Sequence, residues 1–316
     1  MQSDFFSQDF QTSNVQIELS ILEEKEVELW LKREDQIHPD VSGNKFRKLK
    51  YNLQQAAHEN RNTLLTFGGA FSNHILAIAA AGNFSGFKTI GIIRGEELGI
   101  DLEKTLQENS TLRKAKDFGM KLVFISREDY RRKTDADFLQ SLKERFGEFY
   151  LIPEGGTNEL AVKGCEEILT SDDHQFDYIC SCVGTGGTIS GLIRSAEDHQ
   201  QVLGFPALKG DFLKDEIRNW VSNQTNWRLI NEYHFGGYGK YTAELIHFIN
   251  SFYEETTIPL DPIYTGKMLS GIINKIQQNE FPRGTKILAV HTGGLQGIEG
   301  FNKRLERKNS NLRIHL

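Results

Sequence analysis

The sequence has few of the features that mark secreted, membrane-bound or nucleic-acid-binding proteins. Three cysteines in 316 residues are too few for a disulfide framework, and no Cys/His spacing is typical of a zinc site. A net charge of −6 argues against a nucleic-acid or anionic-membrane partner. No apolar run approaches the length of a membrane span, and the first residues lack the layout of a signal peptide. We therefore expect a cytoplasmic protein without a metal site.

The three cysteines are expected to remain reduced. Cys165 lies in a helical segment, whereas Cys180 and Cys182 alternate within one strand-like run. We expect the thiols of Cys180 and Cys182 to point to opposite faces of that strand and to stay unpaired. An odd number of cysteines fits a reducing compartment.

What the sequence does contain is a sustained alternation of short apolar runs and amphipathic segments. The predicted strands are residues 27–32, 64–70, 88–94, 121–126, 149–152, 178–183 and 287–290. The predicted helices are one that begins near residue 45, one that begins at residue 189, and residues 75–82, 101–118, 138–146, 159–169 and 266–277, with 208–221 as a further candidate. No repeat or low-complexity segment interrupts this order, which predicts an α/β protein with parallel sheets.

A lysine occurs at a helix start in the segment 42–51, SGNKFRKLKY. The positive end of the helix dipole disfavours a positive charge at this position. Residues 42–44 form a turn, and Lys45 falls in the first turn of the following helix. Arg47, Lys48 and Lys50 follow closely, and each positive neighbour lowers the pKa of an amine and makes it a better nucleophile. Taken alone, this segment is equally typical of a basic, solvated helix start.

A glycine-rich loop lies between a predicted buried strand and a helix start. Glycine lets the backbone wrap an anion, and the helix start and the threonine hydroxyls supply donors. The loop lacks the lysine of a Walker A motif and departs from the dinucleotide fingerprint, so a phosphate cradle of unknown ligand is favoured over a tight turn. Its residues are Gly184, Thr185, Gly186, Gly187 and Thr188.

Other polar residues lie at predicted strand ends or in glycine-punctuated loops. Ser72, Asn73 and His74 follow an apolar strand, where ligands of α/β proteins usually bind, although taken alone this segment is more simply explained by ordinary helix capping. Tyr238 and Tyr264 each lie in such a loop, as a packing residue or a catalyst. A candidate imine-forming lysine, a phosphate cradle and several hydroxyls suit pyridoxal phosphate.

The order of these motifs resembles the family of 1-aminocyclopropane-1-carboxylate deaminases and D-cysteine desulfhydrases. That family belongs to the tryptophan-synthase-β-like group, the fold type II pyridoxal phosphate enzymes. The resemblance covers roughly residues 25 to 300. It is carried by KRED at 32–35, GNKFRKL at 43–49, SNH at 72–74, GTGGT at 184–188, YTGK at 264–267 and HTGG at 291–294.

The resemblance implies two parallel-sheet α/β domains with the cofactor between them. Residues 1–47 and 159–316 would form the larger, cofactor-binding domain, and residues 48–158 the smaller one. It also implies a homodimer that acts on a small amino acid.

The resemblance further implies roles for individual residues. Lys45 would hold the cofactor covalently and move the substrate's proton. Asn73 would bond the phenolic oxygen of the cofactor ring, and Ser72 would meet the substrate carboxylate with His74 beside it. The implied catalytic residues are Lys45, Ser72, Tyr238 and Tyr264. The implied cofactor-binding residues are Lys45, Lys48, Asn73, Gly184, Thr185, Gly186, Gly187, Thr188 and Thr292. The implied substrate-binding residues are Ser72, Asn73, His74, Tyr238 and Tyr264.

Two threonines bear on the reaction. Members of the family that open the cyclopropane ring have Glu and Leu where this chain has Thr265 and Thr292, as D-cysteine desulfhydrase members do. A carboxylate near the ring nitrogen favours the protonated ring, a strong electron sink, whereas a hydroxyl leaves the nitrogen largely neutral. We therefore expect β-elimination, with D-cysteine giving pyruvate, ammonia and sulfide.

Three alternatives remain open from the sequence. The first is ring opening of 1-aminocyclopropane-1-carboxylate to 2-oxobutanoate and ammonia. The second is a pyridoxal-phosphate-binding protein without catalysis, which the retention of the serine and both tyrosines disfavours. The third is a nucleotide-binding Rossmann protein, which the glycine loop fits poorly. Residues 201–228 read as unlike the family and somewhat short.

Overall fold

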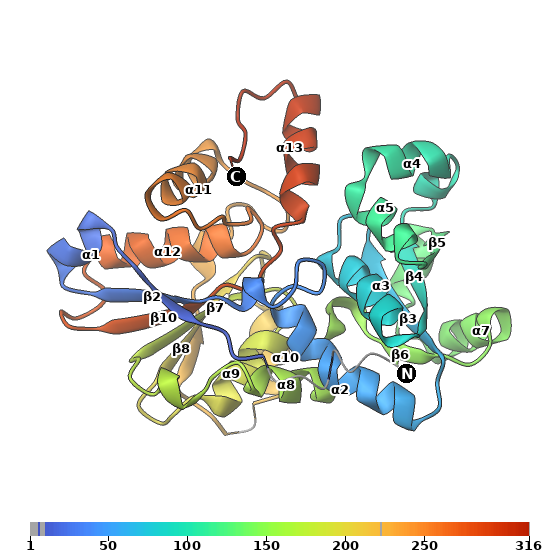
Figure 1. Cartoon of the computed structure of the whole chain (residues 1–316), viewed down its shortest axis with the longest axis horizontal. Coiled ribbons are helices and arrows are strands. Elements are labelled where there is room, and N and C mark those ends of the chain that lie inside the picture. Colours follow the sequence, from blue (N-terminus) through green and yellow to red (C-terminus); the bar gives the residue numbers. More distant parts are fainter. Residues whose placement is uncertain (1–5, 7–9, 222, 316) are drawn as a thin grey trace. The chain divides into compact units, whose positions relative to one another are not determined.

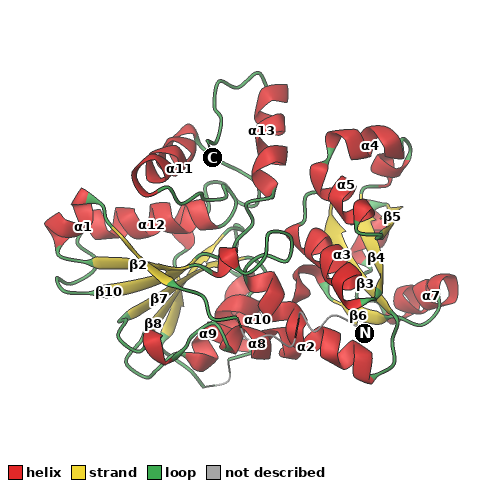
Figure 2. Ribbon diagram, in the orientation of Figure 1, coloured by secondary structure: helices red, strands yellow, loops and turns green. Residues whose placement is uncertain are grey.

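The computed structural model describes residue 6, residues 10–221 and residues 223–315, and it divides the chain into two compact units. One unit contains Leu49–Asn158, and the other contains Phe10–Lys48 and Glu159–Leu316. Each unit has its own sheet flanked by helices (Figures 1 and 2). Of the N-terminal nine residues that the sequence assigns to the larger domain, all but Phe6 lie outside the described residues.

The unit formed by Leu49–Asn158 has a four-stranded parallel sheet in the order β5-β4-β3-β6. Its strands are β3 Thr63–Gly69, β4 Lys88–Arg94, β5 Lys121–Ile125 and β6 Tyr150–Ile152. Phe67 and Ile92 pack with Tyr130 of α6 Arg127–Arg131 and Leu142 of α7 Ala136–Phe146. Helix α3 Asn73–Ser85 follows β3 and is buried along most of its length.

One helix that the sequence predicts in this unit is two separate helices in the structure. Residues 101–118 form two helices, α4 Leu102–Glu108 and α5 Ser110–Asp117, because Asn109 is extended between them (φ −122°, ψ 99°). The Asn109 side chain accepts a hydrogen bond from the backbone N–H of Leu112 and donates one to the carbonyl of Ala70. An asparagine that can cap a new helix start therefore ends the first helix.

The second unit has a six-stranded sheet in the order β1-β2-β10-β7-β8-β9. Its strands are β1 Asn14–Ile17, β2 Glu28–Lys32, β7 Tyr178–Val183, β8 Gln201–Pro206, β9 Trp227–Leu229 and β10 Lys286–Val290. Only the edge strand β1 pairs antiparallel with its neighbour; the other described pairings are parallel. The carboxyl ends of β2, β10, β7 and β8 therefore meet at one edge of this sheet.

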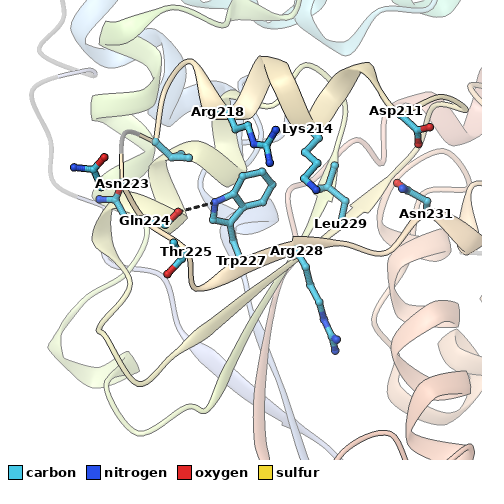
Figure 3. A pocket seen from close by; sticks show the side chains of 11 residues that line it. Asp211, Lys214, Arg218, Asn223, Gln224, Thr225, Trp227, Arg228, Leu229 and Asn231 are labelled. Carbon is cyan, nitrogen blue, oxygen red and sulfur yellow. Dashed lines mark hydrogen bonds between the residues drawn. The ribbon is translucent and has the colours of Figure 1, made fainter.

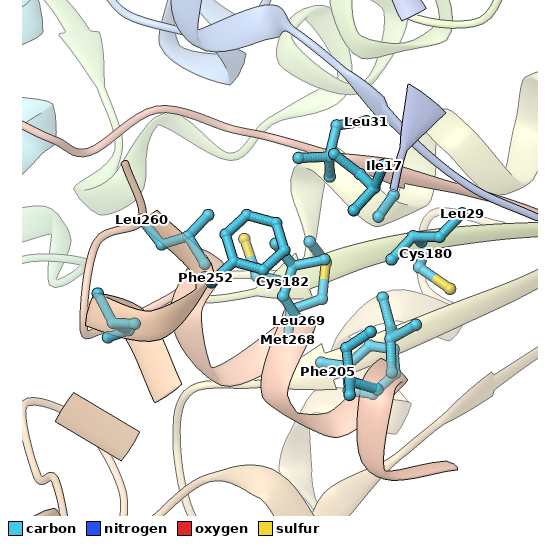
Figure 4. Close-up of a cluster of buried hydrophobic side chains, with 14 of the residues drawn as sticks. Ile17, Leu29, Leu31, Cys180, Cys182, Phe205, Phe252, Leu260, Met268 and Leu269 are labelled. Carbon is cyan, nitrogen blue, oxygen red and sulfur yellow. The ribbon is translucent and has the colours of Figure 1, made fainter. Parts of the chain in front are cut away.

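Helices cover both faces of this sheet, and the side-chain period of two assigns each strand residue to a face. One face packs against α1 Ser20–Lys25, α11 Ala243–Thr256, α12 Thr265–Gln277 and α13 Gly297–Arg307, with Leu29 and Leu31 in the shared cluster (Figure 4). The other face packs against α8 Glu159–Glu166, α9 Gly187–Ser195 and α10 Phe212–Arg218, with Trp30 against it. Burial on both faces explains the nearly continuous apolar strands.

The sequence prediction for the cysteines was correct that they are unpaired and wrong about the faces to which Cys180 and Cys182 point. Cys180 and Cys182 belong to the same buried cluster, because residues two apart in a strand project from the same face. Cys165 lies in the cluster on the opposite face. All three are free thiols.

The region from residue 201 onward departs most from the sequence prediction. Strands β8 and β9 and helices α11 and α13 had not been predicted, and the candidate helix 208–221 is reduced to α10 Phe212–Arg218. Short, fully buried strands such as β8 show no alternation, so their sequence resembles an apolar loop.

A buried ion pair links the carboxyl end of β2 to the segment before β7. The Lys32 amine lies 2.8 Å from Asp173 Oδ2, and the two side chains are 2% and 1% exposed. Asn14 completes the group by donating to Asp173 and accepting from Lys32. Removal of one partner would leave the other charge buried and unpaired.

We expect Lys32→Met to lower the free energy of unfolding by about 3–5 kcal/mol, measured by urea denaturation. The matched control is Lys286→Met on the neighbouring strand, whose pair with Glu28 is 3.8 Å long and more than a third exposed on both sides. The control substitution should lower the free energy of unfolding by less than about 1 kcal/mol. Equal losses in the two variants would contradict the importance of the buried pair.

Candidate active site

Three polar segments follow neighbouring parallel strands of the second unit. Residues 33–35 follow β2, residues 291–294 follow β10, and residues 184–186 follow β7. Since these strands are adjacent and parallel, the three segments meet at the carboxyl edge of the sheet, where α/β proteins bind ligands. The candidate site of this unit is built at that edge.

The helix that carries Lys45, α2 Asn44–His58, begins in close contact with the segment after β10. Gly43 has φ +57°, and a Cβ there would collide with the carbonyl of Thr292. Gly293 has φ +81°, and a Cβ there would collide with the Ser42 hydroxyl. The two turns interlock at positions where only glycine fits, which fixes the start of α2 against the sheet edge.

Buried ion pairs hold the same helix start from the side of β2. Arg47 donates two hydrogen bonds of 2.9 Å to Glu34, and the carboxylate of Glu34 also accepts one of 2.7 Å from Thr12. Arg33 makes a similar two-bond pair with Asp35. The positive charge of Arg47 is therefore compensated, although it lies only two residues from Lys45.

Lys45 has the most unusual ionisation of these residues. Burial, and then the positive charge of Lys48, lower the pKa of its amine from 10.5 to about 7. The thiols of Cys165 and Cys182 are close enough to act on it, but burial raises their own pKa values to about 11 and about 12, so they are uncharged near neutral pH. Near pH 7 the Lys45 amine is about half unprotonated, as a nucleophile or base requires.

The sequence explanation for this low pKa was partly right. Lys48 does lower the pKa of Lys45, but burial is the larger cause. Burial also lowers the pKa of Lys48, which is 3% exposed. Neither burial nor the pairing of Arg47 with Glu34 can be read from the basic run alone.

The glycine loop after β7 fits a phosphate group. Gly186 has φ +86° and precedes α9, a nine-residue helix whose N-terminus has no side-chain cap. Lys48 Nζ donates to Thr185 Oγ1 over 3.4 Å, and Asn44 Nδ2 donates to Thr188 Oγ1 over 2.8 Å. Uncapped backbone N–H groups, threonine hydroxyls and a buried amine together supply what a phosphate monoester needs.

The two predicted tyrosines lie together. Their ring centroids are 6.2 Å apart, and burial and a hydrogen bond with Tyr238 raise the pKa of Tyr264 well above its usual value. A Cβ on Gly184 would come within 3.3 Å of the Tyr264 ring, so this ring lies against the glycine loop. Tyr238 is 49% exposed.

The two threonines have different surroundings. Thr292 is 7% exposed, and its hydroxyl lies 3.1 Å from the thiol of Cys182. The Thr265 hydroxyl donates to Asp261 Oδ1 over 2.8 Å and also accepts from the Asp261 N–H. Thr265 therefore secures the start of α12, and its one proton is committed to Asp261.

His291 is held as a specific tautomer. Its Nε2–H donates to the carbonyl of Pro259 over 2.8 Å, and its Nδ1 accepts from the backbone N–H of Gly293. Because Nδ1 carries no proton in this arrangement, the 3.6 Å separation from Asp35 is a contact and not an ion pair. The ring fixes the glycine turn that supports Thr292.

Three predicted residues belong to the other unit, at the start of α3. Ser72 is the N-cap residue, but its side chain makes no capping hydrogen bond, so simple capping does not account for this serine. Asn73 is the first residue of the helix. Thr66 donates to the carbonyl of Ile152, so His74 Nε2 must donate its proton to the Thr66 hydroxyl.

The second unit thus brings together Lys45, Lys48, residues 184–188, Tyr264, Tyr238 and Thr292, whereas Ser72, Asn73 and His74 are held by the first. The candidate residues that sequence reasoning missed are Asn44, Cys165, Cys182, Asp261 and Lys267. Asn44 and Lys267 lie inside the segments GNKFRKL and YTGK, whose resemblance to the family was the available signal. The two cysteines and Asp261 carry no comparable pattern.

A separate surface pocket of about 980 Å³ opens between α10 and β9 (Figure 3). Lys214 and Arg218 line it from α10, and the Trp227 indole N–H donates to the carbonyl of Gln224 beside them. None of the predicted site residues lines this pocket.

The described residues include neither a membrane-spanning helix nor a cluster of metal ligands. No described helix is both long and apolar enough to cross a membrane. Among residues 6, 10–221 and 223–315, no three His, Cys, Asp or Glu side chains are grouped as metal ligands.

Residues 13–293 match the model of a protein family described as pyridoxal-phosphate dependent enzymes. The chain belongs to this family. It is 31% identical over 295 residues to the bifunctional D-cysteine desulfhydrase/1-aminocyclopropane-1-carboxylate deaminase, mitochondrial, of Arabidopsis thaliana, covering 86% of this chain and 73% of that one. It is 28% identical over 305 residues to the 1-aminocyclopropane-1-carboxylate deaminase of Rhizobium radiobacter, covering 88% and 90%.

A crystal structure described as an ACC deaminase homologue superposes with a TM-score of 0.81 at 26% identity, covering 97% of this chain and 99% of that one. These matches confirm the resemblance, the fold and the pyridoxal phosphate dependence predicted from the motifs. The phosphate cradle and the Lys45 amine of this pyridoxal-phosphate dependent enzyme are suited to that cofactor.

We expect Gly43→Ala to weaken the binding of pyridoxal phosphate by about tenfold or more, because a side chain there displaces the start of α2. Absorbance titration of cofactor-free protein measures the affinity. The control is Gly119→Ala, which also has positive φ (+86°) but no atom within 4 Å of the added Cβ. The control should lose about 1–2 kcal/mol of stability and keep its affinity. An unchanged affinity in Gly43→Ala would contradict the interlock.

We expect the rate at which the protein binds the cofactor covalently to depend on pH through the ionisation of the Lys45 amine. Only the unprotonated amine reacts, so the rate should rise through pH 7 and level off above it, whereas a lysine with the ordinary pKa of 10.5 would still gain at pH 9. Stopped-flow absorbance between pH 5.5 and 9 measures the profile. Lys48→Met removes a positive charge, which should raise the pKa of Lys45 and move the midpoint to higher pH.

Proposed function

We propose that this enzyme is a lyase that removes the β-substituent of a small amino acid, and that its substrate is D-cysteine. D-cysteine and water would give pyruvate, ammonia and hydrogen sulfide. The observation that carries the proposal is the buried Lys45 amine of pKa about 7, next to a phosphate-binding loop at the same sheet edge. The Arabidopsis thaliana relative supports it, since its name includes D-cysteine desulfhydrase.

Individual residues would hold different parts of the cofactor. Lys45 would bind it covalently; the N-terminus of α9, with Gly184, Thr185, Gly186, Gly187, Thr188 and Lys48, would bind its phosphate. Asn73 would bind its phenolic oxygen, and Thr292 would lie at its ring nitrogen. When bound, pyridoxal phosphate withdraws electrons from the substrate α-carbon, which makes the α-proton acidic and lets a β-substituent leave.

Lys45 would remove the α-proton of the substrate. An amine of pKa about 7 is unprotonated often enough at neutral pH to accept this proton, and basic enough to hold it. The half-exposed phenol of Tyr238 would contact the substrate, and Tyr264, which keeps its proton because its pKa is raised, would flank the ring. Ser72, Asn73 and His74 would bind the substrate carboxylate.

Elimination is favoured over ring opening by the surroundings of the two threonines. Neither Thr265 nor Thr292 is a carboxylate, and the buried carboxylate of Asp261 already accepts from Ile263, Tyr264 and Thr265. An acid whose lone pairs are occupied in this way is a poor partner for a ring nitrogen. With the Thr292 hydroxyl instead of a carboxylate at its ring nitrogen, the bound cofactor would supply weaker electron withdrawal, which favours loss of a β-substituent over ring opening.

Deamination of 1-aminocyclopropane-1-carboxylate is the second candidate. It is favoured by the names of the Rhizobium radiobacter relative and of the similar crystal structure, and by the second activity in the Arabidopsis name. Its product would be 2-oxobutanoate instead of pyruvate, so one assay distinguishes the two. We also propose a cytoplasmic homodimer; sedimentation equilibrium would then give twice the 36.0 kDa chain mass.

We expect the purified protein with pyridoxal phosphate to absorb visible light and to convert D-cysteine to pyruvate and sulfide. Lys45→Ala should abolish both the absorbance of the covalent complex and turnover, because no other amine replaces it. The matched control is Lys303→Ala, at a partly exposed lysine of α13 that pairs with Glu299, and it should leave both unchanged. A Lys45→Ala variant that still turns over, or a wild type that releases only 2-oxobutanoate from the cyclopropane substrate, would overturn the assignment.

A further inference from the structure

A second buried lysine, Lys267, lies in the first turn of α12 and has no part in the proposed reaction. It is 2% exposed, and its amine donates to the carbonyls of His234 over 2.8 Å and Gly237 over 2.9 Å. A buried ammonium group is costly unless its protons are used by acceptors. Here two carbonyls of one loop, residues 234–239, supply that compensation.

This loop carries Tyr238 and has a backbone that needs support. Phe235 has φ +50°, an uncommon value for a non-glycine residue, and Gly236, Gly237 and Gly239 also have positive φ. Few side-chain contacts can fix so many glycines, so the loop depends on hydrogen bonds to its backbone. Lys267 provides two of these.

Tyr238 lies between two residues whose backbone carbonyls accept hydrogen bonds from side chains of other elements. On one side Lys267 bonds the carbonyl of Gly237, and on the other Arg304 of α13 donates to the carbonyl of Gly239 over 3.0 Å. The Tyr238 side chain is 49% exposed, and its ring meets that of Tyr264 at a centroid distance of 6.2 Å. The hydrogen-bonded backbone on either side of Tyr238 places the ring for this contact.

The start of α12 holds the partner tyrosine as well. Asp261, which is 2% exposed, accepts from the backbone N–H groups of Ile263, Tyr264 and Thr265. Burial lowers the pKa of Lys267 to about 8, and the negative charge of Asp261 opposes that shift. Two opposite buried charges at one helix start therefore each fix the backbone of one tyrosine.

We propose that Lys267 is a positioning residue that sets the Tyr238 phenol against Tyr264 through the backbone of residues 234–239. It does not touch the substrate. This inference rests on the proposed role of Tyr238 in catalysis, while its structural half stands independently. A lysine that served only to stabilise α12 would leave the Tyr238 loop unchanged when replaced.

The first test is hydrogen exchange of the holoenzyme, followed by mass spectrometry. Lys267→Met should raise amide exchange in residues 235–240 by about tenfold or more, because the backbone anchors are lost. The matched control is Lys275→Met on the same helix, which is also buried but pairs with Glu280. It should leave exchange in this loop unchanged, and Lys267→Arg, which keeps charge and donors, should show a smaller increase than Lys267→Met.

The second test is a double-mutant cycle on kcat with D-cysteine. Lys267→Met should lower kcat by about tenfold with a smaller change in KM, and in a Tyr238→Phe background it should have little further effect. Equal kcat losses with and without Tyr238 would overturn the positioning role. If Lys267→Met does not fold, Lys267→Arg and Lys267→Gln are compared in both tests.

The outcomes separate this inference from the proposed function. Unchanged exchange in residues 235–240 of Lys267→Met would overturn the inference whatever the activity. Altered exchange in an enzyme that does not turn over D-cysteine would support the structural half and overturn the proposed substrate instead.

Discussion

The candidate site depends on a buried amine that is kept away from carboxylate partners. The two acids that follow β2 are committed elsewhere: Glu34 to Arg47, and Asp35 to Arg33. The charge that acts most strongly on Lys45 is therefore the like charge of Lys48. A carboxylate beside Lys45 would stabilise its ammonium form and raise its pKa, and the amine would lose its reactivity near pH 7. The KRED segment at residues 32–35 thus contributes to the site by forming ion pairs that do not include Lys45.

Such a site is unfavourable for folding, and the surrounding packing has to offset it. Two buried lysines with lowered pKa values lie at the edge of a sheet whose two faces are covered by apolar clusters. The interlock of Gly43 with Thr292, and of Gly293 with Ser42, joins the helix start to the strand end without any charged contact. Rigidity at this point comes from close backbone packing, which leaves the electrostatic setting of the amine undisturbed.

Much of the fold and part of the site could be predicted from the sequence. Apolar runs bounded by glycine predicted the strands that lead into the polar segments, because fully buried parallel strands leave that pattern. The break at Asn109 was missed, since an asparagine inside a helical pattern can lie on the surface as easily as it can cap. Strand β8 was missed because its buried sequence lacks alternation.

The chemistry of the site was harder to read, because it depends on contacts between distant residues. The compensation of Arg47 comes from a residue 13 positions away, and the pKa of Lys45 depends on burial that no local pattern reports. Thr265 had been assigned a part in setting the ring nitrogen, but its hydroxyl is used by Asp261. From the sequence alone, Ser72 was more simply explained as a capping residue, and only the structure shows that its side chain makes no capping hydrogen bond.

The placement of the cysteines gives the protein an internal reporter. Cys165, Cys180 and Cys182 all belong to the second unit, are fully or nearly fully buried, and have thiol pKa values raised by burial. In the native state they would react slowly with alkylating reagents, whereas unfolding restores an ordinary thiol. The first unit contains no cysteine. The rate of thiol labelling therefore measures the opening of the second unit, which contains Lys45, and does not report on the opening of the first unit.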